Sequence, residues 1–198
     1  MLQGRSKPFW VLMVSDSLIN GLTKRETKGL GVASQETSVK LGEIIRAQKT
    51  DVKVTEWDKG KIPKRLFPLS RARNGIQMGP DWSWRVVTFT ALNQNFRILM
   101  RLNESTEYFA SILALDVNGD SAVLCHHELH TSHRNWHCHY VPGDTRQTFP
   151  GVWRDTERMV SWPTFSDDEC RTEFTVTKAN ALSVSADRFR FSAQGALL

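Results

Sequence analysis

The sequence predicts an α+β fold, in which an antiparallel sheet of five or more strands follows a basic N-terminal region that carries the main helix. From residue 82 onward, segments rich in β-branched and aromatic residues alternate with short polar turns, as expected for antiparallel strands. Before residue 80, one stretch instead has apolar residues at helical spacing. The chain has 198 residues, of which 40% are hydrophobic, and this is enough for a sizeable ordered core.

The N-terminal region, residues 1–80, is predicted to contain a strand, the helix, a second strand and a basic loop. The first strand is expected at residues 8–16 and the second, which alternates, at residues 51–57. Residues 34–49 are predicted to be helical, with Ser34 or Thr37 as the cap. The apolar stripe of this helix comprises Val39, Leu41, Ile44 and Ile45.

Residues 81–198 are predicted to form a mainly antiparallel β region that contains the histidines. Strands are expected at residues 84–92, 95–103, 107–117, 121–128 and 136–141. Asn118-Gly119 is a strong signal for a type I′ hairpin turn, and residues 129–135 are expected to form a loop. Residues 149–169 are expected to be irregular or partly helical, with closing strands at 172–178 and 188–192. The two regions are separate domains or one continuous domain.

Charge is distributed unevenly along the chain. Residues 1–80 hold 15 Lys and Arg against 7 Asp and Glu, a net charge of +8, whereas the remaining residues have a net charge of −3. The densest basic stretch runs from residue 59 to residue 73 and is called the basic segment below. It is predicted to bind the nucleic-acid backbone through Lys59, Lys61, Lys64, Arg65, Arg71 and Arg73.

Cysteine content and hydropathy predict a soluble protein of the reducing cytoplasm. The chain has three cysteines, which cannot all pair with one another, so a disulfide scaffold is not expected. The apolar run at residues 9–14 is short for a signal peptide, and no run approaches the roughly 20 apolar residues that span a bilayer. No membrane association is expected.

All six histidines lie within residues 126–139, in the stretch HHELHTSHRNWHCH. If residues 136–141 are a strand, His137 and His139 lie on one face and Trp136, Cys138 and Tyr140 on the other. Two imidazoles side by side on a strand can chelate a divalent metal, and His130 is the best-placed third ligand. The identity of the metal is left open.

The spacing H-T-x5-H-x-H at residues 130–139, followed by apolar residues, resembles the three-histidine motif of HUH-type relaxases and nickases. This resemblance implies that His130, His137 and His139 hold a divalent metal that polarises a scissile phosphate, on a central antiparallel sheet. Those enzymes also use a tyrosine nucleophile, and the tyrosines of this chain are Tyr108 and Tyr140. The resemblance covers about fourteen residues and supports a metal site more than it supports strand transfer.

Three other interpretations of the histidine cluster stay open. The histidines can be an incidental, solvated loop. Cys125, Cys138 and two histidines can form a closed structural zinc site. A metal-free pair of histidines can act as general base and acid in RNA cleavage, with His126, His127 and His133 as further candidates.

Several other residues are candidates for roles beside the histidines. Glu128 is a candidate catalytic base or a partner that orients a histidine, and Arg134 is a candidate to stabilise a phosphate in the transition state. The acidic run at residues 167–169 is a weaker cation-binding candidate. Trp82 and Trp84 are candidates to stack on bases, although tryptophan in a strand is usually part of the core.

The function expected from these features is metal-assisted cleavage of nucleic-acid phosphodiesters, with His137, His139, Glu128 and Arg134 as catalytic candidates. Nucleic acid is the expected partner. The alternative is a non-catalytic assembly subunit, in which the basic segment contacts nucleic acid or an acidic protein and the histidine cluster is structural or incidental.

Overall fold

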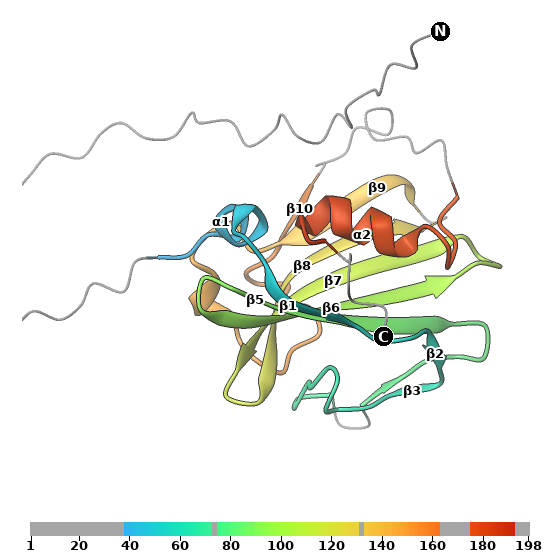
Figure 1. The fold of residues 1–198 in the computed structure, drawn as a ribbon, viewed down its shortest axis with the longest axis horizontal. Coiled ribbons are helices and arrows are strands. Elements are labelled where there is room, and N and C mark those ends of the chain that lie inside the picture. Colours follow the sequence, from blue (N-terminus) through green and yellow to red (C-terminus); the bar gives the residue numbers. More distant parts are fainter. Residues whose placement is uncertain (1–37, 73–74, 131–132, 163–174, 193–198) are drawn as a thin grey trace, which may run out of the picture. The chain divides into compact units, whose positions relative to one another are not determined.

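An eight-stranded, fully antiparallel sheet dominates the computed structural model (Figure 1). The structure describes residues 38–72, 75–130, 133–162 and 175–192, all within one unit, Ser38–Leu198; the remaining unit is Met1–Thr37. The predicted strand at residues 8–16 and the acidic run at 167–169 lie outside the described residues. None of the helices in the described part of the chain is long and apolar enough to cross a membrane.

The strand order in the sheet is β1-β5-β6-β7-β8-β9-β10, with β2 also paired to β5. The strands are β1 Thr50–Val54, β2 Asp58–Lys59, β5 Ser83–Ala91, β6 Gln94–Asn103, β7 Tyr108–Val117, β8 Asp120–His130, β9 His133–Tyr140 and β10 Val160–Trp162. Two short strands, β3 Lys61–Ile62 and β4 Ile76–Gln77, form a separate pair. The predicted α+β fold with five or more antiparallel strands is therefore confirmed. The division of the chain at residue 80 stays a prediction.

The central meander depends on tight turns. Asn118 and Gly119, between β7 and β8, have φ values of 51° and 80°, as the predicted type I′ turn requires at both positions. The turn between β5 and β6 likewise has positive φ at Leu92 and Asn93. Such short connections place neighbouring strands of the sequence side by side in the sheet.

Two helices cover one face of the sheet, called the helix face here. The helices are α1 Leu41–Arg46 and α2 Ala181–Phe189, and Figure 1 shows α2 lying over β7 and β8. Ile44 of α1 and Phe189 of α2 pack into a core with inward-facing strand residues such as Phe96 and Phe109. α1 lies within the predicted helix, residues 34–49, but is shorter than predicted. The longer helix, α2, was not predicted.

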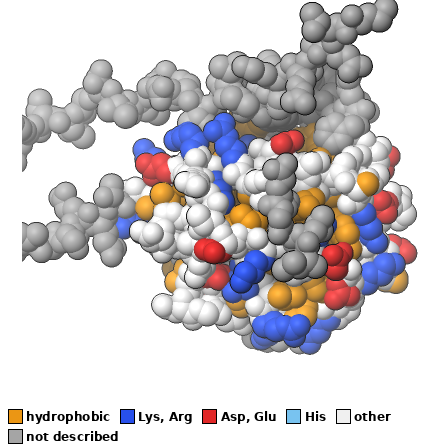
Figure 2. All heavy atoms as spheres, viewed as in Figure 1, with side chains coloured by type: hydrophobic (Ala, Val, Ile, Leu, Met, Phe, Trp, Pro, Cys, Tyr) orange, Lys and Arg blue, Asp and Glu red, His pale blue; other side chains and the backbone are white. Residues whose placement is uncertain are grey.

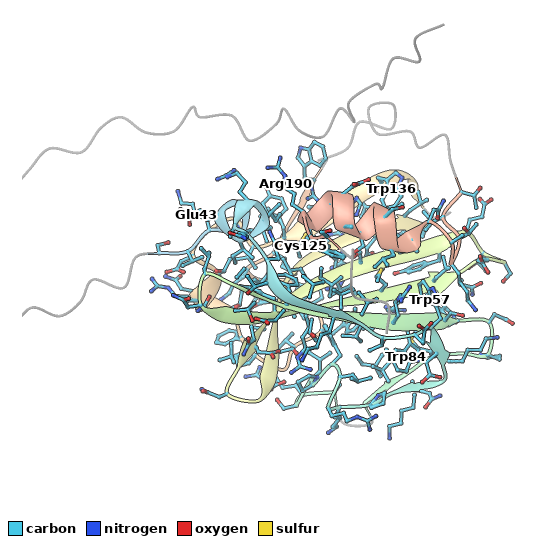
Figure 3. All side chains as sticks on the ribbon, viewed as in Figure 1. Glu43, Trp57, Trp84, Cys125, Trp136 and Arg190 are labelled. Carbon is cyan, nitrogen blue, oxygen red and sulfur yellow. The ribbon has the colours of Figure 1, made fainter. Side chains whose placement is uncertain are left out.

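The basic segment and residues 149–159 cover the opposite face, called the loop face here. Ile62, Phe67 and Leu69 of the basic segment pack against a second core that contains Trp84 and Ile112. In Figure 3, Cys125 and Trp136 lie beside α2, whereas Trp84 lies on the other side of β5 and β6. Trp84 is thus a core residue and is not available to stack on bases.

Three local predictions were wrong. Most of the predicted loop at residues 129–135 belongs to strands, because β8 continues to His130 and β9 begins at His133, which pairs with His130. The predicted closing strand at residues 188–192 begins with the last two residues of α2 and its C-cap, Arg190, which has a left-handed φ of 54°. The alternation of Arg and Phe there resembles strand periodicity, but Phe189 packs into the helix-face core as part of the helix. Thr175–Lys178, the described part of the other predicted closing strand, is not a strand either.

Gly151 joins the basic segment to the start of β8. Its N–H donates to the Ser121 carbonyl (2.8 Å), and its own carbonyl accepts from the Arg71 N–H (3.2 Å). Its φ is +81°, and a Cβ at this position would collide with Ser70 Oγ and lie 2.6 Å from Asp120 Oδ2.

Gly151→Ala is therefore expected to lower the free energy of unfolding by about 1–3 kcal/mol, through backbone strain and overpacking. Chemical denaturation at equilibrium measures this change. Gly143→Ala is the matched control, because no described atom lies within 4 Å of a Cβ added there. Equal stability of the two variants would show that residue 151 tolerates a side chain.

Candidate metal centre

The strands β8 and β9 place the histidines in register. His126 lies opposite His139, and Glu128 lies opposite His137. Since side chains alternate along a strand, His126, Glu128 and His130 share the loop face with His137 and His139. Trp136 lies in the helix-face core, as the sequence predicts for the residues that alternate with His137 and His139.

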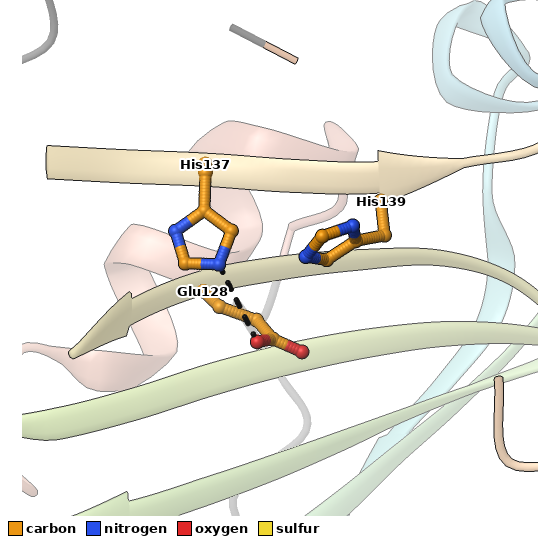
Figure 4. Close-up of side chains that lie close together, drawn as sticks. All are labelled: Glu128, His137 and His139. Carbon is orange, nitrogen blue, oxygen red and sulfur yellow. Dashed lines mark ion pairs between the residues drawn. The ribbon is translucent and has the colours of Figure 1, made fainter. Parts of the chain in front are cut away.

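Glu128, His137 and His139 form a group that can hold a metal ion. Each offers a ligand atom, and these atoms all lie within 4.8 Å of one another (Figure 4). His137 Nε2 is 3.6 Å from Glu128 Oε2. His139 Nδ1 is 2.9 Å from the Ser161 hydroxyl of β10, which leaves Nε2 to act as a ligand. Two imidazoles and a carboxylate bind divalent transition metals and leave coordination positions open.

His126 holds the Glu128 carboxylate in place. Its Nδ1 lies 2.8 Å from Glu128 Oε1, and its Nε2 lies 2.9 Å from the Trp153 carbonyl oxygen. Both ring nitrogens therefore lie within hydrogen-bonding distance of an oxygen atom. His126 is fully buried, so it anchors one carboxylate oxygen and leaves the other, Oε2, facing His130 and His137.

The electrostatics of the group keep its ligands in the form that binds metal. Burial by itself raises the pKa of the Glu128 carboxyl, but hydrogen bonds from His126 and His137 and the charge of Arg154 bring this pKa well below its usual range. Burial, followed by the charge of Arg154, lowers the pKa of His139 to about 4. A carboxylate and a neutral imidazole are therefore present at neutral pH.

Aromatic and cationic side chains surround the group. Tyr108 stacks on the His130 ring at 5.4 Å, and the His130 ring is 4.7 Å from that of His137. The Arg101 guanidinium lies over three rings, at 4.9 Å from Trp82, 5.6 Å from Tyr108 and 5.1 Å from Trp153. Trp82, predicted as a stacking residue, is thus half-buried against Arg101 and Tyr108.

The predicted site residues are only partly brought together. His137 and His139 are in the metal group, and His130 lies beside it, with Nε2 3.8 Å from Glu128 Oε2. Ligation by His130 stays a prediction. His133 and Arg134 lie in β9, but their side chains are outside the described part, as is Arg73. The described cations of the basic segment, which are Lys59, Lys61, Lys64, Arg65 and Arg71, are all exposed.

A second polar cluster lies on the helix face. Cys125 and Cys138 are buried there as free thiols, and Arg188 of α2 donates to Cys138 Sγ at 3.2 Å. Because Cys138 points away from His137 and His139, the sheet separates the cysteines from these two histidines. The described residues do not group the cysteines with other potential ligands as they group Glu128, His137 and His139. This arrangement disfavours the closed Cys/His zinc site.

The metal-free interpretation loses two of its candidates. His127 is on the helix face, stacked on Trp136 at 4.4 Å, and burial lowers its pKa well below the usual value. His126 is fully buried and has both nitrogens engaged. Neither residue can reach a substrate, although either can influence the site through its neighbours.

Sequence reasoning missed two contributors to this site and the ligand role of a third. Glu128 was considered as a base or as a partner of a histidine, but not as a ligand, and Arg101 and Arg154 were not considered. The sequence does contain part of the evidence for Glu128. His126, Glu128 and His130 are separated by single residues, and side chains two residues apart on a strand share a face. Arg101 and Arg154 come from distant positions and carry no such pattern.

Comparisons with known protein families, curated proteins and solved structures gave no match to this chain.

Proposed function

We propose that this protein cleaves phosphodiester bonds in nucleic acid with the help of a divalent metal held by Glu128, His137 and His139. The observation that carries the proposal is the convergence of these three side chains on two paired strands of a large sheet. Such a site fixes the geometry of its ligands, and three protein ligands leave room for water and substrate. The metal would polarise the phosphate or activate water.

The position of the basic segment supports a polyanionic substrate. It covers the same face of the sheet that carries the metal group. Phe67 of the segment packs edge-to-face on Trp153 at 6.4 Å, and the carbonyl of Trp153 is bonded to His126. Figure 2 shows Lys and Arg side chains along the lower rim, where Figure 1 places β2 and β3.

The segment is also held firmly. Arg97 donates through Nη1 to the carbonyls of Arg65 and Leu66, both at 2.8 Å, and pairs with Asp116 through Nη2 at 2.8 Å. These bonds fix the backbone of the basic segment, while the side chains of Lys61, Lys64 and Arg65 remain exposed. Exposed cations on an anchored backbone are suited to holding a phosphate backbone independently of sequence.

Metal-activated water suits this site better than a tyrosine nucleophile of the HUH type. Tyr140 is on the helix face and packs against that core. Tyr108 is on the loop face, but it is stacked on His130, and burial, followed by the charge of Glu128, raises its pKa. A phenol that is harder to ionise is a poorer nucleophile.

The direct test is incubation of the full chain with single- and double-stranded DNA and RNA, with magnesium, manganese, nickel or zinc in turn. Cleavage that is abolished by EDTA and restored by one of these metals is the expected result. If no combination gives cleavage, the protein is not an enzyme of this class, and the non-catalytic assembly subunit becomes the better interpretation.

The basic segment gives a separate prediction about binding. Reversing Lys61, Lys64 and Arg65 to glutamate is expected to weaken nucleic-acid binding and to reduce the slope of log affinity against log salt by up to roughly three, since each phosphate contact releases counterions. Titrations at several salt concentrations measure both quantities.

The control is the reversal of Lys40, Arg46 and Arg190, three exposed cations at the ends of the helices. This variant has the same change in net charge and is expected to keep most of the affinity and slope. Similar losses in both variants would mean that binding follows net charge and not the basic segment.

A further inference from the structure

Two arginines near the metal group have buried N–H groups without a partner. Arg101 Nε and Arg154 Nη2 are inaccessible to solvent and make no hydrogen bond within the described residues. An unsatisfied buried donor is costly, and a charged one more so, so each such group needs an explanation, such as a catalytic role, an ordered water or a bound ion. Both arginines therefore call for an acceptor.

Arg101 is held in a fixed position by the sheet and by aromatic rings. It lies in β6, opposite Trp84 of β5 and Ala110 of β7. Its guanidinium lies over the rings of Trp82, Tyr108 and Trp153, so the cation is stabilised mainly by ring faces. Burial lowers its pKa, while Tyr108 and Glu128 act in the opposite direction. Arg101 and Glu128 thus lie close enough to influence each other.

Arg154 reaches the same place from another part of the chain. It follows Trp153, whose carbonyl bonds to His126 and whose ring packs on His126 at 5.5 Å. The charge of Arg154 lowers the pKa of both Glu128 and His139, and it also acts on Tyr108. Arg101 of β6 and Arg154 of the loop that contains Trp153 are therefore both close enough to Glu128 to interact with its charge.

We propose that Arg101 and Arg154 form a subsite for a tetrahedral oxyanion, the phosphate group of the substrate, next to Glu128, His137 and His139. Arginine suits this role because its planar fork of donors matches phosphate oxygens. The two positive charges exceed the single negative charge of Glu128, so a bound phosphate would balance the local charge and supply the missing acceptors. This inference deepens the proposed function, since it assigns the residues that hold the reacting phosphate.

Inorganic phosphate is the probe that tests the subsite apart from catalysis. Phosphate binding to the full chain is measured by isothermal titration calorimetry and ³¹P NMR, in EDTA and again with metal. Arg101→Met and Arg154→Met are each expected to weaken phosphate binding about tenfold or more, because each variant loses at least one charge-assisted hydrogen bond to the phosphate. Methionine retains much of the volume of the arginine stem and can pack against the rings.

Arg85→Met is the matched control. Arg85 also lies over an aromatic ring, that of Trp57 at 5.3 Å, but its Nε and Nη2 both donate to the Thr55 carbonyl. Its donors are satisfied, so phosphate binding should be unchanged. If Arg101→Met does not fold, as judged by thermal unfolding, Arg101→Lys replaces it; lysine keeps the charge, lacks the fork and should also weaken binding.

The outcomes separate the subsite from the proposed function. Failure of the parent protein to bind phosphate, or equal binding by the parent and both methionine variants, overturns the subsite even if the protein cleaves nucleic acid. Phosphate binding that depends on both arginines supports the subsite. If the same protein then cleaves no nucleic acid with any metal, the subsite stands and the proposed function fails.

Discussion

Glu128→Ala, His137→Ala and His139→Ala are each expected to lower the affinity of the protein for divalent metal by more than about 100-fold. Removing a residue that only orients a ligand typically costs 10–100-fold, and removing a ligand itself should cost more. His126→Ala should fall in that lower range, because His126 holds Glu128 Oε1 but does not face the open side of the group. Competition titrations with a metal-sensitive dye measure all four variants.

His130→Ala decides between two ligand sets. The spacing of the histidines makes His130 the third ligand, whereas the geometry of the described residues makes Glu128 the third ligand. If Glu128 ligates, His130→Ala should retain most of the metal affinity, while Glu128→Ala should lose it. The reverse pattern would restore the three-histidine set, and full retention in every variant would remove the metal site altogether. Circular dichroism and thermal unfolding of each variant separate ligand loss from misfolding.

His137→Ala is expected to reduce nucleic-acid cleavage by roughly 1,000-fold or more. Metal catalysis supplies several kcal/mol of transition-state stabilisation, and each 1.36 kcal/mol corresponds to a factor of ten in rate. His137 faces Glu128 across the strand pair at 3.6 Å and neighbours His139, so its removal opens the centre of the group. Single-turnover cleavage assays at saturating metal give the change in rate.

Tyr108→Phe and Tyr140→Phe are the controls that define the mechanism. With a water nucleophile, both variants should retain most of the cleavage rate, because each keeps the aromatic ring and loses only a hydroxyl. With a tyrosine nucleophile, one variant should be inactive, and the parent protein should form a covalent adduct with DNA that survives denaturing gels. Tyr108 is the better candidate for such a nucleophile, because it lies on the loop face, stacked on His130.

Much of the sheet could be predicted because its signals are local. The ends of β5 to β9 lie within two residues of the predicted ends, except that β9 starts three residues earlier than predicted, and Asn118-Gly119 makes the predicted turn. The helix α2 could not be found in the same way. A helix of nine residues is too short to be stable by itself, so its helical state depends on Ala181 and Phe189 packing against the sheet.

The candidate site shows the same division between local pattern and packing. The sequence alone determined that His137 and His139 share a face, because the period of a β-strand is two and the residues between them point the other way. Only the tertiary structure decided that Glu128 completes the group, since this depends on the register between β8 and β9. It also decided that His126 anchors Glu128 and that Arg101 and Arg154 lie alongside. The contact of Arg101 with the Trp153 ring joins residues 52 positions apart. The physical reason is that strand pairing and the packing of residues 149–159 on the loop face, not the spacing of residues along the chain, bring such residues together.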